Sequence, residues 1–534
     1  MSGSDISIEA LVQQRVEAAK TAAREAEKKG APGDASGSGG NGGGEVTRKF
    51  VNDCLHANQL GDGMLYAALL DGKFVQNMKT EEWLAWAGNF WELDVMKKSL
   101  SSADVVARRY LQEARDLVED IGNAKKNGNE EIAKSFQKQQ HNIYRRVTRL
   151  RSEGGRANCR SFAAINENHP LAITGENLDQ DPWLFACKNG VIDLRTGELR
   201  PGRKDDWITK ASPIEYPGIE ACPTTWVNAL LSIFDGRQDL VDFLQRLLGY
   251  AITGLKSENI LPVFWGGGAN GKTTIVEIVS HILGPMAAPI QSEMLLDQGR
   301  SKSASSASPD IMALKGLRIA FGSESDEGRR FSPAKVKWLS GSDTLVGRSP
   351  YDRYDTYFTP THSLILITNH KPHAPANDFA FWRRVLLIPF TLSFVDVPER
   401  DHERPADKSL PDQLKEEAPA ILSWLVQGCL KWQRDGLAPP KSIVDATEEY
   451  KREEDLLADF LDEKCHIDPK SEIPATDLYD AFKEWFSENV SKRSQFSQKK
   501  FGKLMKDREE FEKVKRGTYF YKGLRLMIGL DSGR

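Results

Sequence analysis

Cysteine pairs, long apolar runs and a strong excess of one charge are all missing from this chain of 534 residues. The six cysteines form no Cys-x-x-Cys pair and have no histidine at zinc-ligand spacing, which excludes a disulfide framework and a zinc motif. We therefore expect free thiols in a reducing compartment. No stretch approaches the roughly 18 apolar residues of a membrane helix, and the N-terminus lacks a signal-peptide core. These absences predict a soluble, cytoplasmic protein with no membrane partner.

The length and the charge indicate several domains with local binding surfaces. At roughly 150 residues per domain, the chain is long enough for three or four domains. Its net charge of −4 is too small for the whole chain to attract nucleic acid, so any such site must be a local basic patch. Residues 30–45 are half glycine, which predicts a flexible linker. The segment before this linker is expected to be either a tethered partner-binding helix or largely disordered.

A glycine-rich stretch between a strand pattern and a helix pattern is the strongest signal in the chain. Leu261, Val263 and Phe264 precede it as a buried strand would, and residues 275–283 follow it with helical spacing. This order is the context of a phosphate-binding loop, whose glycines turn backbone N–H groups towards phosphate oxygens. We expect Lys272 to reach the β- and γ-phosphates of ATP and the Thr273 hydroxyl to bind Mg²⁺. The predicted nucleotide-binding residues are Gly266, Gly267, Gly268, Ala269, Asn270, Gly271, Lys272, Thr273 and Thr274.

A second strand pattern ends in an acid. Residues 317–323 are apolar enough for a buried strand, and Glu324 follows them directly. An acid at the end of a strand beside the phosphate-loop strand can hold Mg²⁺ or polarise the attacking water. Glu324 is preferred for catalysis and metal binding because it directly follows the strand. Asp326 and Glu327 follow closely and are not excluded.

Two further strand patterns carry polar residues at their ends. Residues 363–368 form an apolar run that ends at Asn369, which can orient the lytic water or simply cap a turn. Arg383 and Arg384 stand immediately before the apolar run 385–390. An arginine at a subunit edge can enter the neighbouring subunit's site and stabilise charge in the transition state. The pair is predicted to be catalytic in that sense, with the choice between Arg383 and Arg384 open.

Basic residues interleaved with tyrosines follow between these motifs. Residues 336–357 contain a Gly-Ser-Asp turn and are predicted to form an inserted hairpin that contacts nucleic acid through Lys337, Arg348 and Arg353. An ordinary surface hairpin is the alternative. Further upstream, Arg145, Arg149 and Arg156 are expected on one face of a helix, as either a phosphate-contacting stripe or a solvated face.

The C-terminal region is locally basic. Residues 491–525 contain twelve Lys and Arg against four acids. The pattern of three helices followed by a hairpin at 517–523 predicts a winged-helix domain, with its third helix near residues 496–506. Such a basic domain favours duplex or forked DNA, contacted by Lys499, Lys500 and Lys503. A solvated basic face or a contact between subunits is the alternative.

The motifs together resemble a known family. GGGANGKTT (266–274), IAFGSESDE (319–327), VKWLSGSDTLVGR (336–348), LILITNHKPH (364–373) and FWRRVLLIPF (381–390) are similar to the motif set of superfamily 3 helicases. The likeness is to the phage and plasmid primase family and the poxvirus-type primase-helicases. It extends through DPWLFACKNGVIDLRTGELRP upstream and ATEEYKREEDLLADFL downstream, and so covers roughly residues 50–530.

This resemblance implies a multidomain α/β protein with an AAA+-like P-loop ATPase core, an α+β N-terminal domain and a C-terminal winged-helix domain. It implies a hexameric ring that uses ATP and Mg²⁺ to move 3′ to 5′ on single-stranded or forked DNA during replication of a phage, plasmid or other mobile element. Lys272, Thr273, Glu324 and Asn369 match the family's site residues, and Arg383 or Arg384 its arginine finger. A mobile element of this kind would place the protein in a bacterial host cytoplasm.

The chain departs from the family in two places. Many relatives have tandem acids where this chain has Ser323-Glu324, which weakens the assignment of the metal ligand. Many also carry an N-terminal primase domain, whereas no paired-carboxylate motif is found before residue 180. We therefore expect no primer synthesis by this chain, and a separate primase or polymerase as a possible partner. The alternatives are a DNA-binding replication initiator and a DNA-packaging or remodelling ATPase.

The predicted domain organisation follows from these patterns. It comprises the N-terminal segment with its linker (1–45), an α+β domain (46–220), a helical collar (221–256), the ATPase core (257–395), a helical linker (396–440) and the winged-helix domain (441–534).

Overall fold

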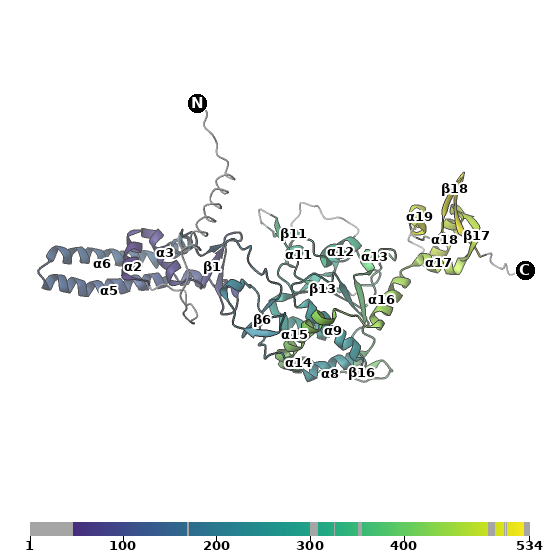
Figure 1. Ribbon diagram of the computed structural model, residues 1–534, viewed down its shortest axis with the longest axis horizontal. Coiled ribbons are helices and arrows are strands. Elements are labelled where there is room, and N and C mark those ends of the chain that lie inside the picture. Colours follow the sequence, from purple (N-terminus) through teal and green to yellow (C-terminus); the bar gives the residue numbers. More distant parts are fainter. Residues whose placement is uncertain are drawn as a thin grey trace, which may run out of the picture.

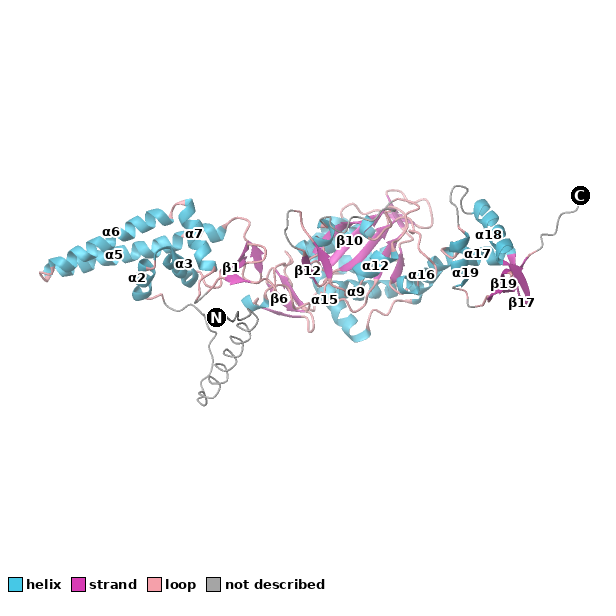
Figure 2. Cartoon of the chain, turned by 90° about the horizontal axis from the view of Figure 1, so that it is seen from above, coloured by secondary structure: helices cyan, strands magenta, loops and turns pink. Residues whose placement is uncertain are grey.

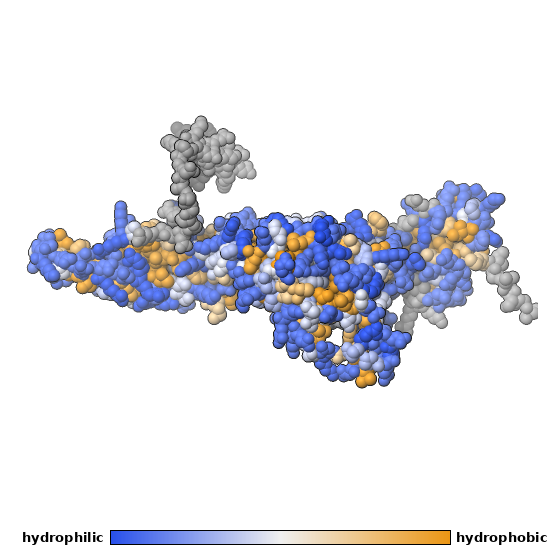
Figure 3. Space-filling view, turned by 60° about the horizontal axis from the view of Figure 1, so that its bottom comes forward, coloured by the Kyte–Doolittle hydropathy of each residue, from blue (hydrophilic) through white to orange (hydrophobic). Residues whose placement is uncertain are grey.

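The computed structural model describes residues 46–527 except 168–169, 299–307, 325, 351–354, 490–496, 507 and 509. The chain is elongated, and its parts follow one another along the long axis (Figure 1). A helical N-terminal region lies at one end, a parallel sheet with its helices lies in the middle, and a small C-terminal module lies at the other end. The surface shown in Figure 3 is mostly hydrophilic, with smaller hydrophobic groups. Within the described part, no helix is long and apolar enough to cross a membrane.

The N-terminal region contains a small sheet, several shorter helices and a projecting pair of antiparallel helices, α5 and α6 (Figure 2). The sheet has the order β3-β2-β1-β4. Ile143, Val147 and Leu150 are buried at helical spacing, because α6 turns this apolar stripe towards α5. The elements are α2 Arg48–His56, α3 Asn58–Leu69, β1 Phe74–Asn77, β2 Glu82–Trp86, β3 Trp91–Leu93, α4 Lys98–Ser101, α5 Asp104–Lys126, α6 Glu130–Leu150, α7 Glu153–Ala164 and β4 Ala172–Ile173.

The predicted arginine stripe is broken by a helix end. Helix α6 ends at Leu150, and Ser152 caps the next helix by accepting the Gly155 N–H at 3.1 Å. Arg145 and Arg149 therefore lie on α6, whereas Arg156 lies on α7. The expectation of one continuous face was wrong, because it extended a single helical period across a residue that begins a new helix.

A second small sheet leads towards the core. Strands β5 Leu184–Cys187, β6 Gly190–Asp193 and β7 Glu198–Arg200 form consecutive antiparallel hairpins. The short helix η1 Lys204–Asp206 follows, and then α8 Thr224–Ile233 and α9 Gln238–Ala251. Phe185 and Ile192 are fully buried and join the main core, so this sheet packs against the central region.

The centre of the molecule is a parallel sheet of five strands in the order β14-β8-β13-β10-β9. Successive side chains on a strand point to opposite faces, and this alternation divides the core in two. Phe264, Ile365 and Ile388 face the helices on one side, whereas their neighbours Val263, Leu366 and Leu387 face the other side. The strands are β8 Leu261–Trp265, β9 Ala287–Gln291, β10 Ile319–Glu324, β13 Ser363–Thr368 and β14 Val385–Pro389.

Strand β10 is not the neighbour of β8. The sequence reasoning placed the strand that ends at Glu324 beside the strand that precedes the glycines, but β13 lies between them. The register pairs Glu324 with Thr368 and Thr368 with Trp265. All three strand ends therefore still meet at the same edge of the sheet.

Helices cover both faces of the sheet. One face carries α9, α10 Lys272–Leu283 and α15 Ala418–Asp435, and the other carries α12 Pro333–Ser340, α13 Phe379–Trp382 and part of α16 Lys441–Glu453. Helix α15, which was predicted to lie in a linker, is buried against α9. The remaining elements here are η2 Gly284–Met286, η3 Ser292–Met294, α11 Pro309–Met312, β11 Leu345–Gly347, β12 Thr356–Phe358, β15 Ser393–Val395, β16 Glu403–Pro405 and α14 Leu410–Glu416.

The C-terminal module has its own core. Its sheet has the order β17-β19-β18, and Phe460, Phe482 and Phe501 pack together from three helices. The predicted hairpin exists, but its turn is at Gly517 and β19 continues through Gly523. Strand β17 was not predicted, because its sequence CHIDPKSEIP is mostly polar and exposed. The elements are α17 Leu456–Lys464, β17 Cys465–Pro474, α18 Ala475–Asn489, α19 Gln498–Lys506, β18 Lys513–Arg516 and β19 Thr518–Leu526.

The close crossing of α9 and α15 predicts that alanine substitution of two helical glycines has very different effects on stability. A Cβ on Gly428 would lie 2.1 Å from the Gln245 carbonyl oxygen, whereas a Cβ on Gly122 of α5 would meet nothing within 4 Å. Gly428→Ala should force the two helices apart and cost about 1–3 kcal/mol of unfolding free energy. Gly122→Ala, the matched control, should be neutral or stabilising by up to about 1 kcal/mol. Scanning calorimetry measures both, and equal unfolding temperatures for the two variants would contradict this account of the crossing.

Candidate functional site

The glycine-rich loop, residues 266–271, connects β8 to α10 at the carboxyl edge of the sheet, and the predicted motif continues into the first turn of α10. Gly266 and Gly271 have φ values of 154° and 87°, and a Cβ on either would lie 2.1 Å from the Phe390 oxygen or 2.5 Å from Ile233. Gly267 and Gly268 have open space where a Cβ would be. Two glycines thus permit the backbone path, and two leave room for a ligand to approach the backbone.

Lys272, the first residue of α10, folds back over this loop. Its Nζ donates to the carbonyl oxygens of Gly266 at 2.6 Å and Gly267 at 2.9 Å, and to Asn270 Oδ1 at 3.0 Å. The side chain is only 4% exposed, and burial lowers the pKa of Lys272 to about 8. Within the described residues no carboxylate forms an ion pair with it. A phosphate anion would supply the missing negative charge.

Asn369 and Glu324 reach the same place from neighbouring strands. Asn369 directly follows β13, and its Oδ1 lies 3.5 Å from Lys272 Nζ. Glu324 ends β10 and is 8% exposed. Both line one cavity with Lys272 and Thr273, so the structure brings together residues that are 97 positions apart in the sequence. Parallel strands explain this, because their carboxyl ends share an edge.

The carboxylate of Glu324 is held in a fixed orientation. Its Oε2 accepts the Ser292 hydroxyl at 2.9 Å, its Oε1 accepts the Asp326 N–H at 2.9 Å, and Arg329 Nε lies 3.6 Å from Oε2. Asp326 and Glu327 are exposed and are not among the residues that line the cavity. Glu324 is therefore better placed than either for contact with a ligand. Sequence reasoning missed Ser292 and Arg329, since neither belongs to a motif.

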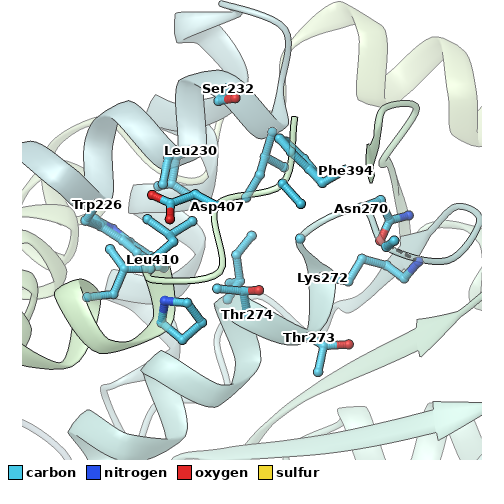
Figure 4. A pocket seen from close by; sticks show the side chains of 18 of the residues that line it. Trp226, Leu230, Ser232, Asn270, Lys272, Thr273, Thr274, Phe394, Asp407 and Leu410 are labelled. Atoms are coloured by element: carbon cyan, nitrogen blue, oxygen red, sulfur yellow. Dashed lines mark hydrogen bonds between the residues drawn. The ribbon is translucent and has the colours of Figure 1, made fainter. Parts of the chain in front are cut away.

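The cavity has a volume of about 740 Å³, which is the size of a small-molecule site. Figure 4 shows Lys272 and Asn270 on one side and Trp226, Leu230 and Leu410 on the other. The apolar wall comes from α8, β15 and α14, and the Phe394 N–H holds β15 to the loop by donating to the Ala269 oxygen at 2.6 Å. Sequence reasoning placed α8 before the loop but did not predict this wall, whose parts have no motif.

Arg383 and Arg384 lie at the opposite end of the sheet. The Arg384 oxygen accepts the N–H of Leu261, which is the first residue of β8, whereas the glycine-rich loop follows the last one. At about 3.3 Å per residue, the length of β8 separates them by roughly 17 Å. Arg383 is exposed, while Arg384 Nη1 donates to the Ala380 oxygen at 2.5 Å, and burial and the Arg383 charge lower the pKa of Arg384. Neither arginine contributes to the cavity of its own chain.

The predicted DNA-contacting residues are dispersed. Lys337 lies on α12 and pairs with Asp378 at 3.0 Å, so its charge is already partly compensated. Arg348 follows β11 of a two-stranded hairpin and is half-buried, and Arg353 lies outside the described residues. Lys499 is exposed on α19; Lys500 and Lys503 lie on the same helix, and their side chains are outside the described part.

The hairpin of the C-terminal module adds residues that sequence reasoning did not select. Lys513 Nζ lies 4.5 Å from the ring centre of Tyr519 and 5.5 Å from that of Tyr521. Lys515 lies 5.8 Å from Tyr519, whose side chain is 49% exposed. A basic, aromatic strand surface next to α19 suits contact with a nucleic acid. The alternation of lysine and tyrosine in 513–521 was the available signal.

The lowered pKa of Lys272 predicts a pH dependence of anion binding. Only the charged amine attracts phosphate, so affinity should be highest below pH 8 and fall as pH rises through 8. The dissociation constant of a non-hydrolysable ATP analogue should increase about fivefold between pH 8 and pH 9. Lys272→Arg keeps its charge and should show a constant affinity over that range. Isothermal titration calorimetry measures both, and a flat profile for the unaltered protein would refute the assignment.

The chain is similar to viral proteins over much of its length. Residues 64–235 match the family described as D5 N terminal like. Among curated proteins, the putative helicase L207/L206 of Acanthamoeba polyphaga mimivirus is 29% identical over 59% of this chain and 34% of its own. The putative helicase 022R of Frog virus 3 is 26% identical over 59% and 40%, and the putative primase C962R of African swine fever virus (strain Badajoz 1971 Vero-adapted) is 24% identical over 59% and 34%.

These matches relate the chain to viral proteins named as helicases and primases. The chain spans about a third to two fifths of the length of these relatives. Among solved structures, the apo C-terminal region of NrS-1 covers 58% of this chain and 76% of its own at 13% identity, with a TM-score of 0.34. That score is too low to support a structural argument. The chain is thus similar to the family described as D5 N terminal like over residues 64–235, and over 59% of its length to viral proteins named as putative helicases or primases.

Proposed function

We propose that this chain is an ATP-dependent DNA helicase of superfamily 3 that acts as a ring during DNA replication. The observation that carries the proposal is the convergence of Lys272, Thr273, Glu324 and Asn369 on one cavity at the carboxyl edge of a parallel sheet. This edge is where ligands bind in open α/β sheets. The position of β8 between β14 and β13, with the next strand in sequence at the far edge, supports an AAA+-like core.

The residues present fit ATP with Mg²⁺. The buried amine of Lys272 has only carbonyl and amide oxygens as hydrogen-bond partners within the described part of the chain, and a Cβ on Gly267 or Gly268 would meet open space, which leaves room for phosphate oxygens. Thr273 and Glu324 offer the oxygen ligands that Mg²⁺ prefers, and this ion takes further ligands from water and phosphate. When bound, it neutralises phosphate charge. The apolar wall of Trp226, Leu230 and Leu410 suits the nucleobase.

The protein's own groups would perform the remaining tasks. Lys272 binds the β- and γ-phosphates, and release from its present carbonyl partners accompanies that contact. Asn369 is near enough to the amine to sense this change and to orient the attacking water. Glu324, held by Ser292 and the Asp326 N–H, polarises that water. No primer synthesis is assigned to this chain.

The cavity is proposed to be half of a shared site. Lys272 is the only basic residue among the described residues that line it, so the transition-state charge on the γ-phosphate lacks a second basic side chain. Arg383 and Arg384 cannot supply it within the same chain, as they lie at the other end of β8. Arg383 is the better finger, since it is exposed while Arg384 is tied to Ala380. The exposed ring of Phe379, one helical turn away, supports a protein contact there.

The DNA contacts are assigned to two places. The β11–β12 hairpin with Arg348, and Arg353 beyond the described residues, is proposed to contact single-stranded DNA in the ring with 3′ to 5′ movement. The C-terminal module, with α19 and the β18–β19 hairpin, is proposed to act as a winged helix on forked DNA. A replication initiator, favoured by this basic module, is the second candidate; a packaging or remodelling ATPase is the third.

A comparison of DNA unwinding by the unaltered protein and by the Lys272→Ala variant tests the proposed function. The unaltered protein should separate a duplex with a 3′ single-stranded tail when given ATP and Mg²⁺. Lys272→Ala should lose at least a hundredfold in ATP hydrolysis, because removing a preorganised charge costs roughly 2.7–4 kcal/mol or more in the transition state, and should lose unwinding while retaining DNA binding. A gel-based strand-separation assay measures this. If single-stranded DNA stimulates ATP hydrolysis but no strands separate, the remodelling candidate is favoured. If the main activity of the protein on DNA persists in Lys272→Ala although hydrolysis is lost, the initiator is favoured.

Mixed rings test the shared site. Arg383→Ala subunits should poison rings made with unaltered subunits, so that hydrolysis falls more steeply than the fraction of unaltered protein. Arg384→Ala should act mainly through stability, because its guanidinium anchors the end of α13. Hydrolysis is measured across a titration of mixtures at constant total protein. A linear decline with the Arg383→Ala fraction would show that this arginine does not act in the neighbouring subunit.

A further inference from the structure

The segment that follows Asn369, residues 370–374, is attached to the end of α16. Lys371 Nζ lies 2.9 and 2.7 Å from the two carboxylate oxygens of Glu453. Two residues later, His373 Nδ1 lies 3.0 Å from Glu454 Oε1, and the Ala374 N–H donates to Glu454 Oε2 at 2.9 Å. Two consecutive acids therefore hold the backbone that leaves the candidate sensor residue.

The same segment touches the strand that carries the glycine-rich loop. Lys371 Nζ lies 4.4 Å from the ring centre of Trp265 and 5.6 Å from that of Tyr450, within the range of cation–π attraction. Trp265 is the last residue of β8, directly before Gly266. The Tyr450 hydroxyl, on α16, donates to the Pro372 oxygen. Lys371 thus contacts both the base of the loop and the helix, with only 16% of its side chain exposed.

Helix α16 itself is fixed to the sheet. Ile443 and Tyr450 are fully buried, and the Leu387 N–H of β14 donates to the Thr447 hydroxyl at 3.0 Å. Tyr450 also packs edge-on against Trp382, with 5.0 Å between ring centres. The end of this helix is therefore held against the sheet on one side and against the segment 370–374 on the other.

Asp455, which follows Glu453 and Glu454, belongs to the C-terminal module. Asp455 begins α17 by accepting the Ala458 N–H at 3.2 Å, and it pairs with Arg508 Nη2 at 2.5 Å. Arg508 lies between α19 and β18, the elements that carry the basic surface of the module. Only Glu454 separates Glu453, the last residue of α16, from this cap. Glu453, Glu454 and Asp455 form one acidic junction that is paired with a base on both sides.

We propose that this acidic junction couples the nucleotide cavity to the C-terminal module, so that occupation of one changes the affinity of the other. The path runs from Arg508 through Asp455, Glu454 and Glu453 to His373 and Lys371, and then to Asn369 and the amine of Lys272. Lys371 acts as a positioning residue for Asn369. The inference rests on the proposed function for the two ligands, ATP and forked DNA. It adds a coupling between them that is reciprocal, as any linkage of two binding equilibria must be.

Two alterations outside the cavity test this coupling. The dissociation constant of a non-hydrolysable ATP analogue is measured on the full chain with and without saturating forked DNA, and that of DNA with and without the analogue. In the unaltered protein, saturating DNA should change the dissociation constant of the analogue by about fivefold or more. The analogue should change the dissociation constant of DNA by the same ratio. Arg508→Ala and Glu453→Gln should each bring that ratio to within twofold of one, while the analogue still binds in the absence of DNA. Arg508→Lys, which retains the charge, should restore most of it.

A matched control separates coupling from general loss of structure. Arg516 pairs with Glu472 at 3.1 Å in the same module, away from the junction. Arg516→Ala should weaken DNA binding at most and leave the ratio unchanged. If the unaltered protein binds both ligands with a ratio of one, or if Arg508→Ala and Glu453→Gln retain its ratio, the proposed coupling is wrong. If the unaltered protein does not bind the analogue at all, the proposed function itself fails.

Discussion

The buried amine of Lys272 is the group on which the site is organised. Four oxygens surround it, three from its own loop and one from Asn369. This arrangement needs the loop path that Gly266 and Gly271 allow, and it needs β13 next to β8 so that Asn369 comes within reach. Because burial lowers the pKa of Lys272, the charged amine is held at a cost in a place where an anion would relieve it. An ionisable group whose pKa is shifted by burial and which lines a cavity is typical of a ligand-binding site.

The parallel sheet gives the molecule two different ends. Its carboxyl edge collects the glycine-rich loop, Glu324 and Asn369, whereas its amino edge carries Arg383 and Arg384. Since one chain cannot bring both ends together, a second copy offers the simplest way to complete the proposed site. The junction at 453–455 lies at the boundary with the C-terminal module, and it is paired with Lys371 beside the central sheet and with Arg508 in the module.

Prediction from the sequence succeeded where a pattern is local and strongly periodic. The strands β8, β10, β13 and β14 are continuous apolar runs, and their ends were placed correctly to within two residues. It failed where packing decides. The break between α6 and α7 depends on a single cap at Ser152, and β17 is a polar strand that exists because β19 pairs with it. The apolar wall of the cavity comes from α8 and α14, which are separated by almost two hundred residues and share no motif.

The sequence alone identifies the loop, the acids, the asparagine and the arginines as candidates, because each stands at one end of an apolar run and has a chemistry that suits phosphate, Mg²⁺ or the attacking water. Which of these residues meet depends on how the strands are arranged in the fold. Strand order put β13 between β8 and β10. Because the strands are parallel, Glu324 and Asn369 lie at the same edge as Lys272, whereas Arg383, which precedes β14, lies at the other edge. The pairing of Lys371 and His373 with two acids more than eighty residues later could not be read from the chain, because side chains so far apart in sequence are joined only by the packing of α16 on the sheet.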